Sequence, residues 1–340
     1  MSILVTGGSG YIGSHTCLEL IKADYDVIVI DNLSNSHKIS LDRIKEMTGK
    51  NIEFYNVDLM DRASLEKIFK MHNIEAVMHF AGLKAVGESV TKPLLYYKNN
   101  IISSLVLFEV MAKFNVKKLV FSSSATVYGF QKVTPIKESA TRSTTNPYGS
   151  TKLIIEQILE DIAFSDKEWD ISVLRYFNPI GADSSGLLGE DPNGIPNNLM
   201  PYITQVALGK LDELSIFGQD YETKDGTGIR DYIHVVDLAK GHIKALQYPH
   251  KGVEAFNLGT GTGSSVLDLV TTFELATGVN IKHKFVKRRP GDIACCYADV
   301  SKAELILGWK AEKNLYEMCK DSWRWQSKNP EGYHFEKSYF

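Results

Sequence analysis

A tyrosine and a lysine stand four residues apart in the segment Asn146-Pro-Tyr-Gly-Ser-Thr-Lys152. In a helix this spacing places the side chains of Tyr148 and Lys152 on one face, about 6 Å apart along the axis. A neighbouring ammonium lowers the pKa of a phenol from its usual value of about 10, which makes the phenol a usable general base. Taken alone, the pair could equally be exposed, with the lysine stem lying along the surface. The surrounding motifs decide between these interpretations.

A hydroxyl-rich strand end, Phe121-Ser-Ser-Ser124, precedes the pair, and a glycine-rich loop lies near the start of the chain. The loop, Gly7-Gly-Ser-Gly-Tyr-Ile-Gly13, follows an apolar run and opens a helical pattern. Glycine in this context lets backbone N–H groups and a helix N-terminus approach a pyrophosphate. The loop therefore predicts a dinucleotide site, and the tyrosine and lysine then indicate proton and hydride chemistry.

Two aspartates follow later apolar runs. Asp31 comes 18 residues after Gly13, close to the distance at which a carboxylate binds the adenosine ribose hydroxyls. A 2′-phosphate would meet like charge there, so NAD is favoured over NADP. Asp58 is a candidate for contact with the adenine, although it could equally cap a turn. A second cluster, Gly259-Thr-Gly-Thr-Gly263, is not expected to bind a nucleotide, because Ser264-Ser265 is typical of a helix N-cap.

The fold class follows from short apolar runs that alternate with helical patterns through the first half of the chain. The runs are Ile3–Val5, Val27–Ile30, Ile52–Val57, Ala76–Phe80, Leu119–Phe121 and Ile171–Leu174. This pattern predicts an α/β protein with a doubly wound parallel (Rossmann) sheet. Near Asn178 the composition changes to Gly, Pro, Asn and Asp. We predict a dinucleotide-binding domain over residues 1–178 and a smaller α/β domain over 179–340, with strands around 231–259 (231–237 and 255–259) returning to the first sheet.

Composition excludes several classes of function. The formal net charge of −3 and the sequence pI of 6.3 provide no basic field for nucleic acid or an anionic membrane. We find no basic leader and no apolar run near the roughly 20 residues of a membrane span. These two observations predict a cytoplasmic location. The four cysteines show no CxxC spacing, which favours reduced thiols over a disulfide or zinc framework. His79 and His234 lie in apolar runs without a ligand partner at helical spacing, so no metal is expected.

With these motifs in hand, the chain resembles the extended short-chain dehydrogenase/reductase family and, within it, the nucleotide-sugar 4-epimerases. The resemblance covers essentially the whole length. Its most specific segments are Phe80–Ser89, Ser122–Gly129, Arg175–Pro179, Gly194–Pro201, Asp225–His234 and Arg288–Asp292. It implies that the second domain binds a UDP-sugar and that the first holds NAD throughout the cycle.

The implied activity is the reversible epimerisation of UDP-glucose and UDP-galactose at C4 through a 4-keto sugar. Tyr148 would take the proton from the C4 hydroxyl while hydride passes to NAD. Lys152 would hold the nicotinamide ribose and lower the tyrosine pKa, and Ser124 would hydrogen-bond the reacting oxygen. Two alternatives are an oxidoreductase or dehydratase of the same family and a non-catalytic NAD-binding module. A dehydratase would carry acidic residues where this chain has Ser124-Ala-Thr126, and a module would tolerate loss of the tyrosine or lysine.

The resemblance also assigns residues to each ligand. Those implied for NAD are Gly7, Gly10, Tyr11, Ile12, Gly13, Asp31, Asn32, Leu33, Ser34, Asn35, Ser36, Asp58, Leu59, Phe80, Ala81, Gly82, Leu83, Lys84, Asn99, Ser124, Tyr148, Lys152 and Phe177. Those implied for the UDP-sugar are Lys84, Ser124, Tyr148, Asn178, Asn197, Asn198, Leu199, Ser215, Ile216, Phe217, Arg230, Tyr232, Arg289, Asp292 and Cys296. The arginines suit a diphosphate, although either could instead form a surface ion pair.

Two further expectations come from the resemblance. Cys296 stands where some members of the family carry a tyrosine against the sugar, and a smaller side chain leaves room at the sugar 2-position. UDP-N-acetylglucosamine and UDP-N-acetylgalactosamine are therefore expected to be interconverted as well. The helical stretches Tyr96–Phe114 and Tyr148–Phe164 could pair with those of a second copy, which predicts a homodimer.

Overall fold

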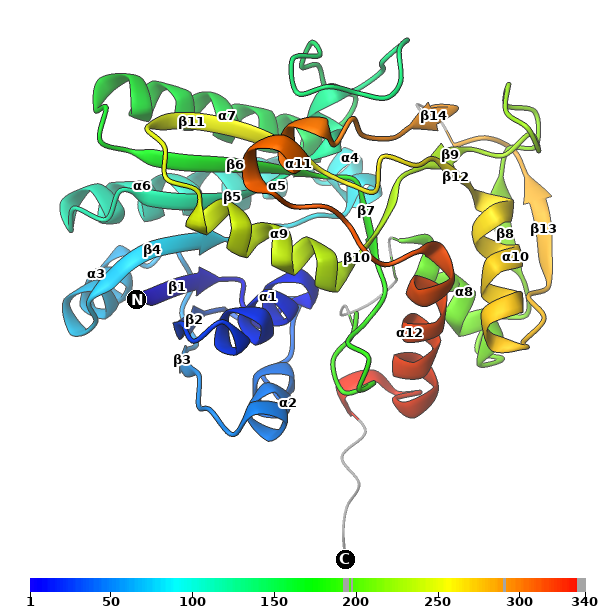
Figure 1. Ribbon diagram of the computed structural model, residues 1–340, viewed down its shortest axis with the longest axis horizontal. Helices are drawn as coiled ribbons and strands as arrows, with labels where there is room; N and C mark the ends of the chain where they lie inside the picture. Colours follow the sequence, from blue (N-terminus) through cyan, green and yellow to red (C-terminus); the bar gives the residue numbers. More distant parts are fainter. Residues whose placement is uncertain (192–195, 197, 290–291, 335–340) are drawn as a thin grey trace, which may run out of the picture.

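The computed structural model describes residues 1–191, 196, 198–289 and 292–334, and its larger lobe is built on a seven-stranded sheet (Figure 1). The strand order is β11-β6-β5-β4-β1-β2-β3, with every neighbouring pair parallel. The strands are β1 (Ser2–Thr6), β2 (Asp26–Ile30), β3 (Glu53–Tyr55), β4 (Ile74–His79), β5 (Lys118–Ser124), β6 (Asp170–Tyr176) and β11 (Gly252–Leu258). The predicted parallel α/β sheet is confirmed.

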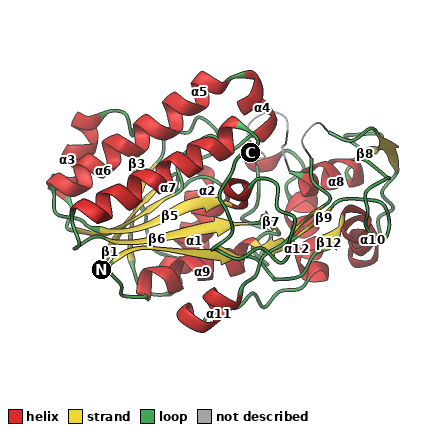
Figure 2. Cartoon of the chain, turned by 90° about the horizontal axis from the view of Figure 1, so that it is seen from above, coloured by secondary structure: helices red, strands yellow, loops and turns green. Residues whose placement is uncertain are grey.

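Helices cover both faces of this sheet (Figure 2). On one face lie α1 (Tyr11–Lys22), α2 (Ile39–Thr48) and α9 (Val235–Gln247), and on the other α3 (Arg62–Met71), α6 (Ser103–Lys113) and α7 (Pro147–Ser165). Along β1, Ile3 and Val5 pack toward the first group, whereas Leu4 packs toward the second. Because successive side chains of a strand alternate between two buried faces, the strands read as continuous apolar runs in the sequence.

Shorter elements complete the larger lobe. They are α4 (Val86–Thr91), α5 (Pro93–Tyr97), the π-helical turn η1 (Lys98–Ile102), the 3₁₀ turn η2 (Ala125–Tyr128) and α11 (Ser301–Leu307). Among the described residues, no helix is both long enough and apolar enough to cross a bilayer.

The smaller lobe lies on the right of Figure 1. Its elements are β7 (Asn178–Ile180), α8 (Leu199–Ala207), β8 (Leu214–Phe217), β9 (Ile229–Arg230), β10 (Tyr232–His234), β12 (Ser264–Ser265), α10 (Val266–Thr277), β13 (His283–Val286), β14 (Cys295–Cys296), α12 (Leu315–Lys328) and η3 (Gly332–His334). Ile203 of α8, Phe273 of α10 and Met318 of α12 belong to one buried apolar cluster. The predicted second, smaller α/β lobe is therefore present.

One of the two segments expected to return to the large sheet does so. β11 pairs with β6 at the sheet edge. The expectation is wrong for residues 231–237, because β10 pairs with β7 in a separate two-stranded sheet and α9 begins at Val235. The helix forms because Val235, Leu238, Ala239 and Leu246 recur at helical spacing and are all buried.

The second glycine cluster is a turn before a capped helix, as predicted. The Ser265 hydroxyl accepts a hydrogen bond from the backbone N–H of Asp268, whose carboxylate accepts one from the Ser265 N–H. The buried Asp231 carboxylate accepts hydrogen bonds from the N–H groups of Thr260 and Gly261 within the turn. A side chain, rather than a nucleotide, therefore satisfies these N–H groups.

A buried ion pair fixes α7 against the sheet next to the Tyr148 and Lys152 pair. Arg175 on β6 donates hydrogen bonds from Nε and Nη2 to the two carboxylate oxygens of Glu156, at 3.0 and 2.7 Å. The side chains are only 4% and 1% exposed. Ser123 on β5 donates a third hydrogen bond to the same carboxylate. Because Glu156 lies one helical turn after Lys152, these bonds set the position of α7 relative to β5 and β6.

Replacing Glu156 with glutamine should lower the free energy of unfolding by about 3–5 kcal/mol, because it leaves a buried guanidinium without its counter-charge. Urea denaturation of the purified variant measures the change. Glu312→Gln is the matched control, since it breaks the exposed Lys240–Glu312 pair and should have little effect. Equal midpoints for the two variants would show that the buried pair does not stabilise the fold.

Candidate active site

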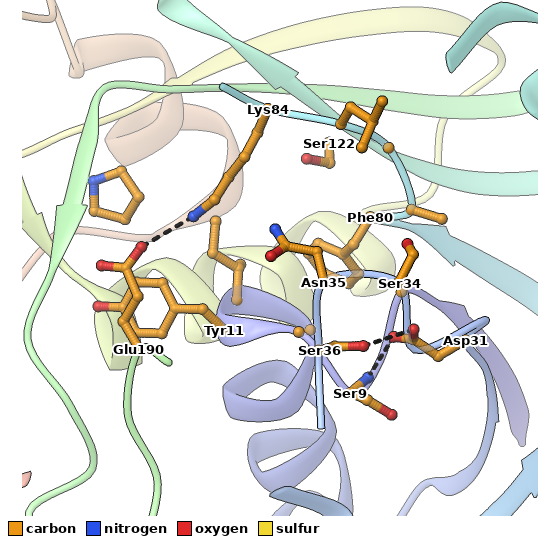
Figure 3. Close-up of a pocket in the computed structure, with 18 of the residues that line it drawn as sticks. Ser9, Tyr11, Asp31, Ser34, Asn35, Ser36, Phe80, Lys84, Ser122 and Glu190 are labelled. Atoms are coloured by element: carbon orange, nitrogen blue, oxygen red, sulfur yellow. Dashed lines mark hydrogen bonds and ion pairs between the residues drawn. The ribbon is translucent and has the colours of Figure 1, made fainter. Parts of the chain in front are cut away.

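The carboxyl ends of the central strands open onto one pocket, part of which is drawn in Figure 3. β1 is flanked by β2 on one side and β4 on the other, so the chain winds in opposite directions on the two sides of β1. In doubly wound sheets this point leaves a crevice in which ligands bind. The pocket is lined by residues of both lobes, among them Gly10, Tyr148 and Asn198.

The glycine loop forms a cradle that excludes side chains. Gly7 has a φ of +70°, and a Cβ atom on it would lie 2.7 Å from the backbone nitrogen of Ala81. A Cβ on Gly13 would lie 2.2 Å from the carbonyl oxygen of Gly7. Gly10, the N-cap of α1, provides no side-chain cap, which suits an anion at that helix end. This loop therefore fits the pyrophosphate of a dinucleotide.

Asp31 is held rigidly at the end of β2. Its side chain accepts hydrogen bonds from the Ser9 N–H at 3.0 Å and the Ser36 hydroxyl at 2.8 Å (Figure 3). It accepts a third from the Leu33 N–H at 2.9 Å. Asp58 lines the same pocket and also accepts hydrogen bonds from Asn32 Nδ2 and the Met60 N–H. Asp58 therefore caps a turn and also faces the pocket, and its contact with the adenine stays a prediction.

Tyr148, Lys152 and Ser124 meet in this pocket. α7 starts at Pro147 and is capped by Asn146, whose side-chain oxygen accepts a hydrogen bond from the Gly149 N–H at 2.8 Å. The tyrosine and the lysine thus lie on the first two turns of a well-capped helix. Lys152 is 5% exposed, and its Nζ donates a 2.6 Å hydrogen bond to the Ser122 carbonyl oxygen.

Burial acts on the pKa values of both groups. It raises the pKa of Tyr148 above its usual value, and the hydrogen bond with the Ser124 side chain acts in the opposite direction. Burial also lowers the pKa of Lys152 to about 8, against an upward influence from Glu156. The sequence predicted a lowered pKa for Tyr148, whereas the structure shifts this pKa upward. Desolvation of the phenol dominates, while the Lys152 ammonium is bound to the Ser122 carbonyl oxygen.

The two histidines from the apolar runs are hydrogen-bonded. The ring nitrogens of His79 lie 2.7 Å from Thr6 Oγ1 and 2.9 Å from Ser104 Oγ, and burial lowers the His79 pKa to about 3. His234 is hydrogen-bonded to Asp321 and to the Val236 N–H. No group of three metal-ligating side chains is found within the described parts of the chain.

The pocket gathers most residues assigned to the cofactor. Every one of them except Leu33 lines it, and Leu33 contributes its backbone N–H to Asp31. From the sugar set, Lys84, Ser124, Tyr148, Asn178 and Asn198 line it. Asn197 lies outside the described residues. The remaining members, Leu199, Ser215, Ile216, Phe217, Arg230, Tyr232, Arg289, Asp292 and Cys296, belong to the smaller lobe and are not part of this lining.

The two arginines of the sugar set already have partners in the smaller lobe. Arg230 forms an ion pair with Asp292, and the Arg289 guanidinium carbon lies 3.9 Å from the centre of the Phe217 ring. β14 pairs with β9 so that Cys296 is the register partner of Arg230. These residues thus form two small groups, one on β9 and β14 and one beside β8.

Several pocket residues were not anticipated from the sequence. They include Ser9, His37, Ser122, Tyr176, Gly189, Glu190, Asp191 and Tyr333. Glu190 accepts hydrogen bonds from Lys84 Nζ at 3.0 Å and Asn198 Nδ2 at 2.9 Å, so its carboxylate links the lobes across the pocket (Figure 3). The only sequence signal for Glu190 and Asp191 is a pair of acids in a Gly-rich segment, and Tyr333 has no signal.

Known proteins resemble the chain over both lobes. Residues 3–259 match the NAD dependent epimerase/dehydratase family. The UDP-glucose 4-epimerase of Bacillus subtilis (strain 168) is 60% identical over 335 residues, which cover 98% of this chain and 99% of that protein. The Bifidobacterium longum UDP-glucose 4-epimerase, crystallised with NAD+ and UDP, has a TM-score of 0.95 and 55% identity, with 98% and 100% of the two chains covered.

A more distant structure is that of the UDP-Glc/GlcNAc 4-epimerase from Campylobacter jejuni. It has a TM-score of 0.84 and 35% identity, and the match covers 96% of this chain and 99% of that one. The family match includes the glycine loop, Asp31 and the Tyr148 and Lys152 segment. From this match and the shared fold, the chain belongs to the NAD dependent epimerase/dehydratase family.

Proposed function

We propose that the protein is a UDP-glucose 4-epimerase, which interconverts UDP-glucose and UDP-galactose through a transient 4-keto sugar and keeps NAD bound throughout. The observation that carries this proposal is that Tyr148, Lys152 and Ser124 open into the same pocket as the glycine cradle and Asp31. A hydride acceptor can therefore reach the C4 carbon of a sugar while a proton-transfer group reaches the hydroxyl on the same carbon. The full-length similarity to UDP-glucose 4-epimerases supports the same activity.

Bound NAD supplies a reversible hydride acceptor. Tyr148 accepts the proton of the C4 hydroxyl and returns it after the keto sugar has presented its other face, while Ser124 hydrogen-bonds the reacting oxygen. Lys152 holds the nicotinamide ribose and provides the positive charge that favours the tyrosine anion. The residues from Asp31 to Ser36 bind the adenosine, with Asp58 beside the adenine.

In this proposal residues 1–178, together with α9, β11 and α11, form the NAD-binding domain, and the smaller lobe within residues 179–340 is the UDP-sugar-binding domain. Arg230 and Arg289 bind the diphosphate, because a guanidinium can exchange an ion pair such as Arg230–Asp292 for forked hydrogen bonds to phosphate. The neighbouring Phe217 ring provides an apolar surface for the uracil. Tyr232, Leu199 and the other members of the sugar set shape the rest of the site.

An oxidoreductase or a dehydratase is the competing activity. Elimination of water after oxidation requires a free acid–base group, and the segment Ser124-Ala-Thr126 contains only hydroxyl and methyl groups. The pocket carboxylate of Glu190 is bound to Lys84 and Asn198. Returning the hydride is then the simplest completion of the cycle.

Incubation of the purified protein with UDP-galactose, without added cofactor, should yield UDP-glucose with no net NADH. Tyr148→Phe should reduce turnover at least about a hundredfold, a typical loss for a general acid–base group, while the NAD content stays unchanged. Tyr316→Phe is the control, because Tyr316 is 46% exposed on α12. Equal turnover of the two variants would remove Tyr148 from the mechanism, and accumulation of NADH with a different sugar product would favour the competing activity.

Cys296 permits UDP-N-acetylhexosamines as additional substrates. Burial raises the pKa of its thiol to about 11, so the reactive thiolate is disfavoured. The relevant difference between Cys296 and a tyrosine at this position is therefore the size of the side chain. Cys296→Tyr should lower the turnover of UDP-N-acetylgalactosamine at least tenfold relative to that of UDP-galactose, because a phenol fills the space for the acetamido group; tenfold corresponds to about 1.4 kcal/mol. Steady-state kinetics on both sugars measure the ratio, with Cys296→Ser as the size-matched control. An unchanged ratio in the tyrosine variant would refute the assignment.

Exposed apolar side chains on the helices from α5 to α6 and on α7 support a homodimer. They include Leu94 at 82%, Ile102 at 43%, Leu105 at 38% and Phe164 at 79% exposure. Sedimentation velocity should find a dimer for the wild type and a monomer for Leu94→Glu. Leu275→Glu, at a leucine on α10 that is 73% exposed, should remain dimeric. A monomeric wild type at micromolar concentration would exclude this proposal.

We also place the protein in the cytoplasm. Its four cysteines are all free thiols, and Cys17 and Cys319 are buried, as is usual for proteins of a reducing compartment. Fractionation of cells into cytoplasm, membrane and secreted material tests the location. Recovery outside the cytoplasmic fraction would contradict it.

A further inference from the structure

A turn near the C-terminal end forms part of the pocket wall. Tyr333, in η3, is 3% exposed and lines the pocket. Its ring lies 4.7 Å from the Trp325 ring and 6.0 Å from the His37 ring, measured between centroids. The guanidinium carbon of Arg43 lies 4.9 Å from the centre of the same ring. The side chain is therefore enclosed by α2, α12 and the segment after β2.

Tyr333 is also hydrogen-bonded to the segment that carries Glu190. Its hydroxyl accepts a hydrogen bond from the Gly189 N–H and donates one to the Gly189 carbonyl oxygen, both at 3.2 Å. Its backbone N–H donates to Asp191 Oδ2 at 2.7 Å. Three hydrogen bonds thus join one residue near the C-terminus to loop 186–191, more than 140 residues earlier in the chain.

The contact between loop 186–191 and the turn at Tyr333 leaves no room for a side chain at Gly189 or at Gly332. A Cβ atom on Gly189 would lie 2.2 Å from the Trp325 ring, and one on Gly332 would lie 2.2 Å from Asp191 Oδ2. Arg43 adds a further connection, because its Nη1 donates to the Leu187 carbonyl oxygen at 2.8 Å. Loop 186–191 is therefore bonded to the larger lobe through Arg43 and to the turn after α12 through Tyr333. In Figure 1 this loop (green) and the end of α12 (red) lie side by side.

Loop 186–191 forms a wall of the pocket that also contains the cofactor cradle. Gly189, Glu190 and Asp191 line it together with Gly10 and Asp31. Glu190 reaches across to Lys84. A dinucleotide lying along the cradle would therefore occupy the pocket that this wall borders.

We propose that Tyr333, Gly189 and Asp191 form a C-terminal clasp that retains the dinucleotide. This inference depends on the proposed function, in which NAD stays bound through many turnovers. Tyr333 is a positioning residue: it holds loop 186–191 closed, and NAD dissociates when the clasp opens. The clasp is independent of Tyr148, so it governs the lifetime of the bound cofactor and not the chemical step.

Tyr333→Phe should release NAD about tenfold faster than the wild type, because it removes the two hydrogen bonds to Gly189 while retaining the packed ring. Asp191→Asn should act in the same direction through the bond to the Tyr333 N–H. Each protein is loaded with NAD and freed of unbound nucleotide by gel filtration. The rate of release is then measured from the NAD that appears in successive filtrates. The melting temperature of the NAD-free proteins is recorded in parallel, since a purely structural role would change it alone.

Tyr316→Phe, on the exposed side of α12, is the control and should release NAD at the wild-type rate. Release at the wild-type rate from both Tyr333→Phe and Asp191→Asn would overturn the clasp, as would a lower melting temperature without faster release. A wild type that retains no NAD at all would contradict the proposed function instead. The two failures are therefore distinguishable.

Discussion

The burial of a phenol and an ammonium in one pocket is the physical constraint on which the rest of this structure depends. Desolvation disfavours the charged form of each group, so it raises the pKa of Tyr148 and lowers that of Lys152 to about 8. The proposed base catalysis by Tyr148 requires the opposite distribution of charge. The surrounding residues must therefore favour a protonated lysine and an ionised tyrosine despite their burial.

The fold provides part of that compensation through Glu156. This carboxylate lies one turn beyond Lys152 on α7 and raises the pKa of the lysine. Arg175 and Ser123 keep the carboxylate in place from β6 and β5. The same contacts that fasten the helix to the sheet thus also bias the protonation of the lysine. Stability and chemistry are coupled here, because both depend on one buried carboxylate.

The two lobes contribute different parts of the pocket. The larger lobe provides the glycine cradle, Asp31, Tyr148 and Lys152, whereas the smaller lobe contributes Asn178, Glu190 and Tyr333. The Lys84–Glu190 ion pair and the hydrogen bond from Arg43 to the Leu187 carbonyl oxygen are contacts between them. The pocket is thus bounded by the carboxyl ends of the large sheet and by loop 186–191.

Features with local causes were predictable from the sequence. The glycine loop, the aspartate after β2, the Tyr148 and Lys152 spacing and the Ser265 cap each depend on residues close together in the chain. In residues 231–237 a strand does form, but its pairing with β7 instead of the large sheet depends on a segment far away in the chain. The start of α9 at Val235 was missed because a short apolar run does not distinguish a strand from the start of a helix. Glu190 and Tyr333 could not be found, since their contacts join segments far apart in the chain. The raised pKa of Tyr148 was also out of reach, because it depends on burial.

The most direct measurement is the ionisation of Tyr148 in the NAD-loaded protein. Ultraviolet difference titration of the wild type against Tyr148→Phe isolates the phenolate signal of this residue. The same titration in a Lys152→Met background removes the ammonium. We expect the phenol to ionise at a lower pH with the lysine than without it, because a neighbouring positive charge favours the anion. Ionisation at the same pH in both backgrounds would contradict the mechanism.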